Sequence, residues 1–293
     1  MKKQRRSNAH NRVAASLALP DTETCLTMLR RLKDRIGMAE IRLDLMESFD
    51  LARLISDAPC PLIMTCRPLR EGGRFAGTEN ERLAILRQAI ELECAYVDIE
   101  WDSLDALLEC PRSGTRLIVS RHWTDEMPAE LLSAYDALKS RADAVKLVGM
   151  ARCETDMLPV FELLQKADKP VIAIAMGEAG ALTRLLAPCF DSCLLTYGAS
   201  STEAITAAGQ LTVSEMVNVY KLHLVNSQTA IRLHLCANKE SAAAAIKQNS
   251  HTNGEVLHVG LVAEAQDIPR LVDGMRSAIS NLTPVINSDL SAR

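Results

Sequence analysis

Aromatic residues and several familiar site motifs are scarce in this chain of 293 residues. Phe, Trp and Tyr together make up 3% of it, which argues against base-stacking platforms for nucleic acids. No apolar run approaches the roughly 18 residues that a membrane span needs. No HExxH segment occurs and no Cys and His stand at close ligand spacing, so a zinc site is disfavoured. The nine cysteines contain no CxxC pair, which predicts reduced thiols in a cytoplasmic protein.

The charge balance is also unremarkable, apart from the N-terminus. Lys and Arg number 33 against 37 Asp and Glu, a net charge of −4 that gives no whole-chain attraction to nucleic acid or membranes. Residues 1–12 are basic and contain no acid, but no apolar signal core follows them. We expect a disordered, solvated arm over 1–12; a nuclear or nucleic-acid tag is the alternative.

Short buried-type runs alternate with helical stretches along most of the chain. Such nearly continuous apolar runs are typical of strands covered on both faces. The expected strands are Val13–Leu17, Ala39–Leu43, Leu62–Cys66, Tyr96–Glu100, Leu117–Arg121, Ala144–Val148, Val171–Ala175 and Cys193–Tyr197. The expected helices between them include Asp21–Arg35, Thr78–Leu92, Glu154–Ala167, Gly180–Leu186 and Val213–Val225. This pattern predicts an α/β fold, a (β/α)8 TIM barrel over residues 13–227, followed by a C-terminal extension over 228–293. An open doubly wound sheet is the alternative, but no GxGxxG follows the first strand.

Charged residues gather where these strands end, which is where barrel enzymes place their chemistry. In the second strand, period-two alternation turns Glu40, Arg42 and Asp44 to one side, the inside of a barrel. Three inward charges need partners, so we expect a substrate-binding cluster; an internal salt-bridge cluster that only fills the barrel is the alternative.

Lys146 is the most unusual single residue, because it stands inside the apolar run Ala144–Val148. Lysine is almost never buried unless it is paired or functional, and burial favours the uncharged, nucleophilic amine. A lysine snorkelling from an exposed edge is the alternative. With His122 closing the fifth strand and several arginines nearby, the pattern indicates Schiff-base chemistry on an anionic carbonyl compound.

Taken in order, these motifs resemble the type I 3-dehydroquinate dehydratases, the Schiff-base enzymes of the shikimate pathway. The resemblance runs from about Val13 to Tyr220. It rests on Ala15-Ser16-Leu17, Glu40 to Asp44, Thr65-Cys66-Arg67 with Glu71-Gly72-Gly73, Asp98-Ile99-Glu100, Val119 to His122, Lys146, Met176 with Arg184, and Tyr197-Gly198 through Gly209-Gln210.

The resemblance implies a role for each matched position. Lys146 is expected to condense with the C3 ketone of 3-dehydroquinate, His122 to act as general acid and base, and Glu71 to orient that His. The implied substrate ligands are Ser16, Glu40, Arg42, Arg67, Arg184, Thr206 and Gln210. No metal and no cofactor are implied. The resemblance implies 3-dehydroquinate as the partner, no nucleic acid and no membrane, and it leaves a homodimer open.

The chain departs from the family in two places. Thr206 stands where many members have Ser, and Ala208 replaces a usual Pro. The tail after residue 228 is weakly similar to the start of a shikimate dehydrogenase substrate domain, to which this barrel is fused in plants and some bacteria. The Ser-rich motif of that family is absent near Asn238–Ser241, and no nicotinamide domain follows in this sequence. We expect a degenerate or truncated remnant; a plain extension packed on the barrel is the alternative.

Two other functions stay open at this stage. One is a Schiff-base aldolase of a phosphorylated sugar, for which Gly177, Gly180 and Gly198 near strands seven and eight would form the phosphate site. The other is a non-catalytic sensor, because fungal quinate-pathway repressors contain domains of this family. Lys146 and His122 are both intact, which favours the enzyme.

Overall fold

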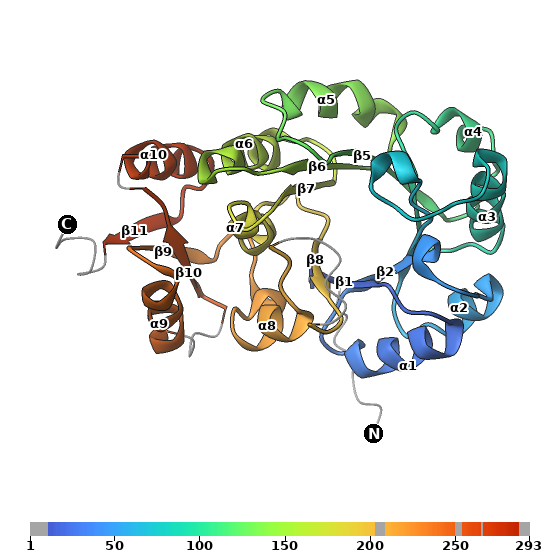
Figure 1. The fold of residues 1–293 in the computed structure, drawn as a ribbon, viewed down its shortest axis with the longest axis horizontal. Helices are drawn as coiled ribbons and strands as arrows, with labels where there is room; N and C mark the ends of the chain where they lie inside the picture. The colour runs from blue at the N-terminus through green and yellow to red at the C-terminus, as the bar shows by residue number, and fades with distance from the viewer. Residues whose placement is uncertain (1–10, 203–208, 250–253, 265, 287–293) are drawn as a thin grey trace.

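The structure is a computed structural model that describes residues 11–202, 209–249, 254–264 and 266–286. Eight short parallel strands form its central sheet in the order β7-β6-β5-β4-β3-β2-β1-β8. The strands are β1 (Val13–Leu17), β2 (Met38–Arg42), β3 (Leu62–Thr65), β4 (Tyr96–Glu100), β5 (Arg116–Trp123), β6 (Ala144–Met150), β7 (Val171–Met176) and β8 (Thr196–Ala199). Because β8 pairs with β1, the sheet curls into a nearly closed (β/α)8 barrel, as predicted (Figure 1).

Closure of the barrel depends on a short contact between its last two strands. Val171 bridges Cys193 at the start of β7, and β8 then pairs along its length with β1. The eighth strand begins at Thr196, later than the predicted Cys193, and ends at Ala199, beyond the predicted Tyr197. The fifth strand runs further than predicted, from Arg116 to Trp123, so that His122 lies within it.

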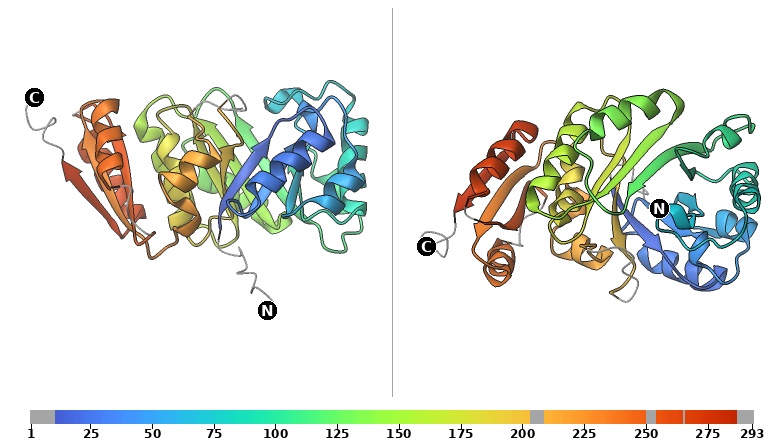
Figure 2. Two further views of the ribbon diagram at one scale, coloured as in Figure 1. Left: turned by 90° about the horizontal axis from the view of Figure 1, so that it is seen from below. Right: turned by 45° about the horizontal axis from the view of Figure 1, so that its top comes forward.

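Helices surround the barrel, as the alternating pattern predicts (Figures 1 and 2). They are α1 (Thr22–Leu32), α2 (Leu51–Asp57), α3 (Glu79–Glu91), α4 (Asp105–Leu108), α5 (Leu131–Leu138), α6 (Leu158–Lys166), α7 (Ala181–Leu186) and α8 (Val213–Asn218). Helix α3 begins with a capping box between Thr78 and Glu81, which satisfies two backbone N–H groups that lack intrahelical partners. Helix α8 is shorter than the predicted Val213–Val225, since Lys221 adopts a left-handed φ of 55° that a continuous helix cannot contain.

The inside of the barrel is divided into an apolar layer and a charged layer. Near the starts of the strands, inward-pointing apolar side chains belong to one buried cluster. Its members there are Ala14, Ile63, Tyr96, Ile118 and Ala144. Two residues further along the same strands, the inward positions are polar: Ser16, Thr65, Asp98, Ser120 and Lys146. Period two thus places a charged layer directly above an apolar plug. The charged layer therefore rests on apolar side chains.

The C-terminal extension forms a smaller parallel sheet beside the barrel. Its elements are β9 (Ala230–Cys236), α9 (Lys239–Asn249), β10 (Val256–Val262), α10 (Ile268–Ala278) and β11 (Leu282–Ile286), with strand order β10-β9-β11. Helix α10 lies against α6, and β10 lies near α7 (Figure 1). Gly274 allows the close approach of α10, since an added Cβ there would be 2.7 Å from Leu158. No helix in the described part of the chain has the length and apolar character to cross a membrane.

Candidate active site

A cavity of about 330 Å³ opens at the C-terminal end of the barrel strands. Its walls combine charged groups with apolar side chains such as Val148, Ile174 and Met176. The predicted site residues that line it are Ser16, Glu40, Arg42, Arg67, Glu71, His122, Lys146, Arg184 and Gln210. Thr206, the remaining predicted ligand, and Ala208 lie outside the described residues. The fold therefore gathers into one cavity every predicted site residue that the structure describes.

Lys146 lies at the centre of this cavity and is only 5% exposed. Its Nζ donates to Glu40 Oε1 at 3.0 Å and to Asp98 Oδ2 at 2.8 Å. The ammonium also lies 4.7 Å from the centroid of the Tyr197 ring, a cation–π distance. The amine is thus buried and paired, not snorkelling from an edge, and two carboxylates hold it in place.

Glu40 is held in place from two sides. The hydroxyl of Ser16 donates to its Oε2 at 2.8 Å and that of Thr65 to its Oε1 at 3.1 Å. Burial alone would raise the pKa of Glu40, but Lys146 and Arg42 outweigh burial and keep that pKa below its usual value. Glu40 is therefore a carboxylate with a fixed orientation toward the amine. Ser16, predicted as a substrate ligand, also orients this carboxylate.

Arg67 connects three carboxyl groups behind Lys146. Its guanidinium bonds to Asp98 Oδ1 at 2.9 Å and to Glu100 Oε1 at 2.5 Å, and it lies 3.7 Å from Glu71 Oε2. Burial opposes ionisation of Asp98, yet Arg67 and Lys146 lower the pKa of Asp98 far below its usual range. Arg67 lines the cavity as predicted, but most of its hydrogen-bonding capacity is used to hold carboxylates.

His122 and Glu71 form a pair at the edge of the same cavity. Nδ1 of His122 lies 2.9 Å from Oε2 of Glu71, which leaves Nε2 as the ring nitrogen available to a bound molecule. Burial raises the pKa of Glu71 to about 8 against the opposing effect of Arg67. Burial, Arg67 and Lys146 lower the pKa of His122 well below its usual range. Both pKa shifts favour the uncharged forms of Glu71 and His122. The hydrogen bond between Oε2 and Nδ1 then contains one proton, which either group can carry.

Asp44, predicted to point into the barrel with Glu40 and Arg42, is not among the residues that line the cavity. Strand β2 ends at Arg42, and Leu43–Leu45 form a 3-10 turn in which period-two alternation no longer applies. Asp44 instead accepts two hydrogen bonds from Arg42, at 2.9 and 2.7 Å, and one from the backbone N–H of Arg74. Asp44 thus holds the planar Arg42 side chain at the wall of the cavity.

Arg184 differs from the other buried cations because no carboxylate balances it. It is 3% exposed on α7, and among the described residues no acidic side chain lies within ion-pair distance. Its Nε has no hydrogen-bond partner there, and burial lowers its pKa to about 10. An unbalanced guanidinium in the wall of a cavity is a ready-made site for an anion.

Three residues of this charge network were absent from the predicted site. Asp98 is the closest partner of Lys146, and Glu100 binds Arg67 and also Arg82 of helix α3. The sequence Asp98-Ile99-Glu100 could have revealed both, because alternation in a strand places these two carboxylates on the same side. Arg82 shares a helical face with Leu86 and Ala89, which are buried, so its place on that apolar stripe is the signal that could have found it.

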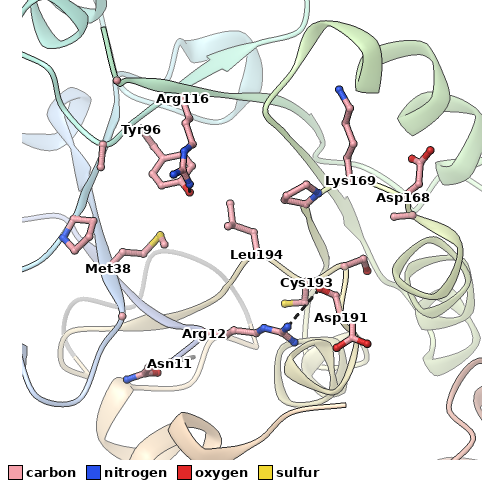
Figure 3. A pocket seen from close by; sticks show the side chains of 17 residues that line it. Asn11, Arg12, Met38, Tyr96, Arg116, Asp168, Lys169, Asp191, Cys193 and Leu194 are labelled. Carbon is pink, nitrogen blue, oxygen red and sulfur yellow. Dashed lines mark hydrogen bonds between the residues drawn. The ribbon is translucent and has the colours of Figure 1, made fainter. Parts of the chain in front are cut away.

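A larger cavity of about 750 Å³ lies at the opposite end of the barrel, where the strands begin (Figure 3). Its cations already have partners: Arg12 donates to three backbone carbonyls, Arg116 to the hydroxyl of Tyr96, and Lys169 to two backbone carbonyls. These bonds join neighbouring elements at the end of the barrel that contributes to stability in this fold. Size alone therefore does not identify the reacting end of this barrel.

The glycines considered for a phosphate site serve packing. An added Cβ at Gly180 would lie 2.4 Å from the carbonyl oxygen of Ala175, and one at Gly198 would lie 2.9 Å from Sδ of Met216. They let α7 approach β7 and α8 approach β8, which weakens the aldolase interpretation. In the described part of the chain, no group of three or more His, Cys, Asp and Glu side chains is arranged to hold a metal ion.

The fold and the cavity together define a (β/α)8 barrel with an enzyme-like site, which contains a buried lysine between carboxylates, a His–Glu pair and an unbalanced arginine. Residues 13–227 match the profile of the family described as type I 3-dehydroquinase, and the chain therefore belongs to that family. It is 36% identical over 192 residues to the 3-dehydroquinate dehydratase of Desulfotalea psychrophila, covering 62% of this chain and 84% of that relative.

Two solved structures show the same fold. The type I 3-dehydroquinate dehydratase of Clostridium difficile, solved with covalently modified comenic acid, superposes with a TM-score of 0.62 and 22% identity over 70% of this chain and 89% of its own. The structure of dehydroquinate dehydratase and shikimate dehydrogenase from S. pombe superposes with a TM-score of 0.59 and 20% identity, over 95% of this chain and 57% of that one. The second match thus extends beyond the barrel.

The shared proton of the His122–Glu71 pair leads to a test by 15N NMR. Below about pH 8, Glu71 is protonated and donates to Nδ1, so the ring proton of His122 is on Nε2. Above that pH the carboxylate accepts from Nδ1–H. We predict a tautomer change of His122 with a midpoint near pH 8, assigned by loss of the signal in His122→Asn. Glu71→Gln should remove the midpoint. A ring already protonated on Nδ1 at about pH 6.5 would contradict the assignment.

Proposed function

We propose that this chain dehydrates 3-dehydroquinate to 3-dehydroshikimate through an imine on Lys146. The observation that carries the proposal is the buried amine, placed in one cavity with a His–Glu pair and with an arginine that lacks an anionic partner. Family membership supports the substrate, because the relatives that match over most of their length are named 3-dehydroquinate dehydratases.

The first step joins the amine to the substrate. Lys146 gives one proton to the His122–Glu71 pair, and the free amine, held by Asp98 and Glu40 at 2.8 and 3.0 Å from Nζ, adds to the C3 carbonyl. The carbonyl oxygen leaves as water with one proton from the amine and one returned by His122, and a protonated imine between C3 and Nζ remains. The positive imine attracts electrons from C2, and the C2 proton becomes acidic.

Elimination and hydrolysis complete the reaction. Nε2 of His122 takes the C2 proton, the electron pair forms the C1–C2 double bond, and the C1 hydroxyl leaves with a proton as water. A water molecule then adds to C3 and releases the amine of Lys146 and the ketone product. The net change is the loss of one water from the substrate, so no oxidant and no metal enter the balance.

Arg184 is proposed to bind the ring carboxylate of the substrate. Its planar guanidinium offers two parallel donors, the geometry that matches a carboxylate. Glu40 and Arg42, both on strand β2, also line the cavity, and we propose that they bind substrate hydroxyl groups. Thr206 and Gln210 complete the proposed ligand set, with Gln210 in the described wall of the cavity.

Covalent chemistry at Lys146 is tested by borohydride trapping. Lys146→Ala should abolish the trappable adduct with 3-dehydroquinate and nearly all turnover, because no other amine stands between the two carboxylates. Lys169→Ala is the matched control, since Lys169 lies at the opposite end of the barrel and should leave trapping unchanged. Peptide mapping that places the adduct on another lysine would overturn the assignment.

The carboxylate assignment is tested through Arg184. A hydrogen bond to a charged group contributes about 1.5–3 kcal/mol, so Arg184→Ala should lower kcat/KM by roughly 10–100-fold. Arg184→Lys should recover only part of the loss, because an ammonium lacks the two-donor geometry. A substrate analogue without the carboxylate should be affected little by either change. Equal losses for acid and analogue would mean that Arg184 holds the fold together.

We propose that residues 228–293 form an extension without a second active site. The place of the Ser-rich substrate motif is taken by Asn238–Ser241, where Asn238 begins α9 by accepting from the backbone N–H of Ser241. A residue used as a helix cap is not free to bind a sugar acid. The purified chain should therefore not oxidise NADPH with 3-dehydroshikimate, measured at 340 nm as about the background rate of the buffer. Substrate-dependent oxidation would refute this proposal.

A further inference from the structure

The charge network of the cavity continues outward to a residue that cannot touch the substrate. Arg82 belongs to α3, behind the barrel wall, and its side chain has no exposed surface. Its Nη1 donates to Glu100 Oε2 at 2.5 Å and to the backbone carbonyl of Cys66 at 3.1 Å. An arginine buried this completely in a helix needs a specific reason.

From Arg82, cations and carboxylates alternate until Lys146 is reached. Oε1 of Glu100 accepts from Arg67 at 2.5 Å, Arg67 pairs with Asp98 at 2.9 Å, and Asp98 accepts from Lys146 at 2.8 Å. Each carboxylate in this series is shared by two cations, one on either side. A change at Arg82 is therefore transmitted to the amine through only three intervening side chains.

The number of charges in the series explains why Arg82 is needed. The buried carboxylates are Glu40, Asp98 and Glu100, and the cations that face them are Lys146, Arg67 and Arg82. Without Arg82, Arg67 would be the only cation bound to Glu100. Burial already raises the pKa of Glu100 in the presence of both arginines, so losing one would favour a neutral Glu100. A neutral Glu100 would hold Arg67 more weakly.

The outer edge of the guanidinium is fixed as well. Nε of Arg82 donates to Glu79 Oε2 at 3.0 Å and Nη2 to Glu79 Oε1 at 2.6 Å. This two-point contact fixes the plane of the guanidinium, and with it the direction in which Nη1 faces Glu100. Arg82 is thus clamped from the surface side and holds Glu100 on the cavity side.

We propose that Arg82 is a positioning residue for the reaction. It keeps Glu100 charged and in place, so that Arg67 stays anchored and Asp98 keeps its position beside the amine of Lys146. This inference rests on the proposed function only in taking Lys146 as the reacting amine. It assigns a role in turnover to a helix residue outside the cavity.

The test compares Arg82→Met, Arg82→Lys and the control Arg87→Met. Arg87 lies on the same helix and, within the described part of the chain, its side chain donates only to the backbone carbonyl of Ala106, so its variant should keep wild-type kcat. Arg82→Met should lower kcat by about 10–100-fold with KM within about threefold, the size expected for a misplaced reacting group. Arg82→Lys should recover only part of kcat, because an ammonium restores a positive charge beside Glu100 but not the two-point contact with Glu79. Borohydride trapping at Lys146 should slow in parallel with kcat.

A double-mutant cycle with Glu100→Gln separates positioning from support of the fold. If Arg82 acts through Glu100, adding Arg82→Met to Glu100→Gln should lower kcat by less than about threefold further. This comparison also decides the matter if Arg82→Met alone does not fold, because the double variant lacks the unbalanced carboxylate. Independent losses, or a folded Arg82→Met with kcat within about twofold of wild type, would overturn the inference. Failure of wild-type protein to trap 3-dehydroquinate would instead overturn the proposed function.

Discussion

Buried charge of both signs, matched residue by residue, is the constraint on which this site depends. An ion without a partner inside a barrel is strongly destabilising, whereas a paired and hydrogen-bonded one is tolerated. The charged layer of this barrel meets that condition because Asp98 bridges Lys146 and Arg67, Glu100 bridges Arg67 and Arg82, and Glu40 pairs with Lys146. The amine is thereby fixed in space before any substrate arrives. Hydroxyl groups of Ser16, Thr65 and Ser120 donate to carboxylate oxygens of Glu40 and Asp98, and an apolar cluster lies beneath the charged layer.

Arg184 stands outside this balance, and its isolation has a physical consequence. Burial lowers the pKa of the Arg184 guanidinium to about 10, and its Nε has no hydrogen-bond partner among the described residues. Such a group destabilises the barrel when no ligand is bound. A bound carboxylate would remove that cost, so part of the affinity for an anionic ligand comes from completing the charge balance of the protein. The paired cations cannot act in this way, because Arg67 and Lys146 already have carboxylates. The same barrel thus separates groups that are held for chemistry from one that is held open for binding.

The fold and much of the site could be predicted from local patterns in the sequence, but the side-chain contacts between different strands and helices could not. Eight buried runs with helices between them sufficed for the barrel, and charges at strand ends sufficed to find Lys146, His122 and Glu40. Period two fails at Asp44 because the chain leaves the strand at Leu43, a boundary that alternation alone cannot detect. Arg82 went unnoticed because helical arginines are usually solvated, and only the packing of α3 on the strands decides that this one is buried. Ion pairs between different elements, such as Lys146 with Asp98, depend on which strands lie side by side in the barrel.

The proton shared by His122 and Glu71 follows from the same balance. Glu71 is the remaining carboxyl group near Arg67, 3.7 Å away, but Arg67 is already bonded more closely to Asp98 and Glu100. A charged Glu71 would add a negative charge for which no free cation remains in this part of the described site, so burial keeps it neutral up to about pH 8. Its proton then serves His122, whose own ionisation Arg67 and Lys146 oppose. The pair therefore starts uncharged, and each proton that it gives to a bound molecule or takes from it changes its own charge by one unit, so a reaction that requires both steps in turn returns the pair to its starting state.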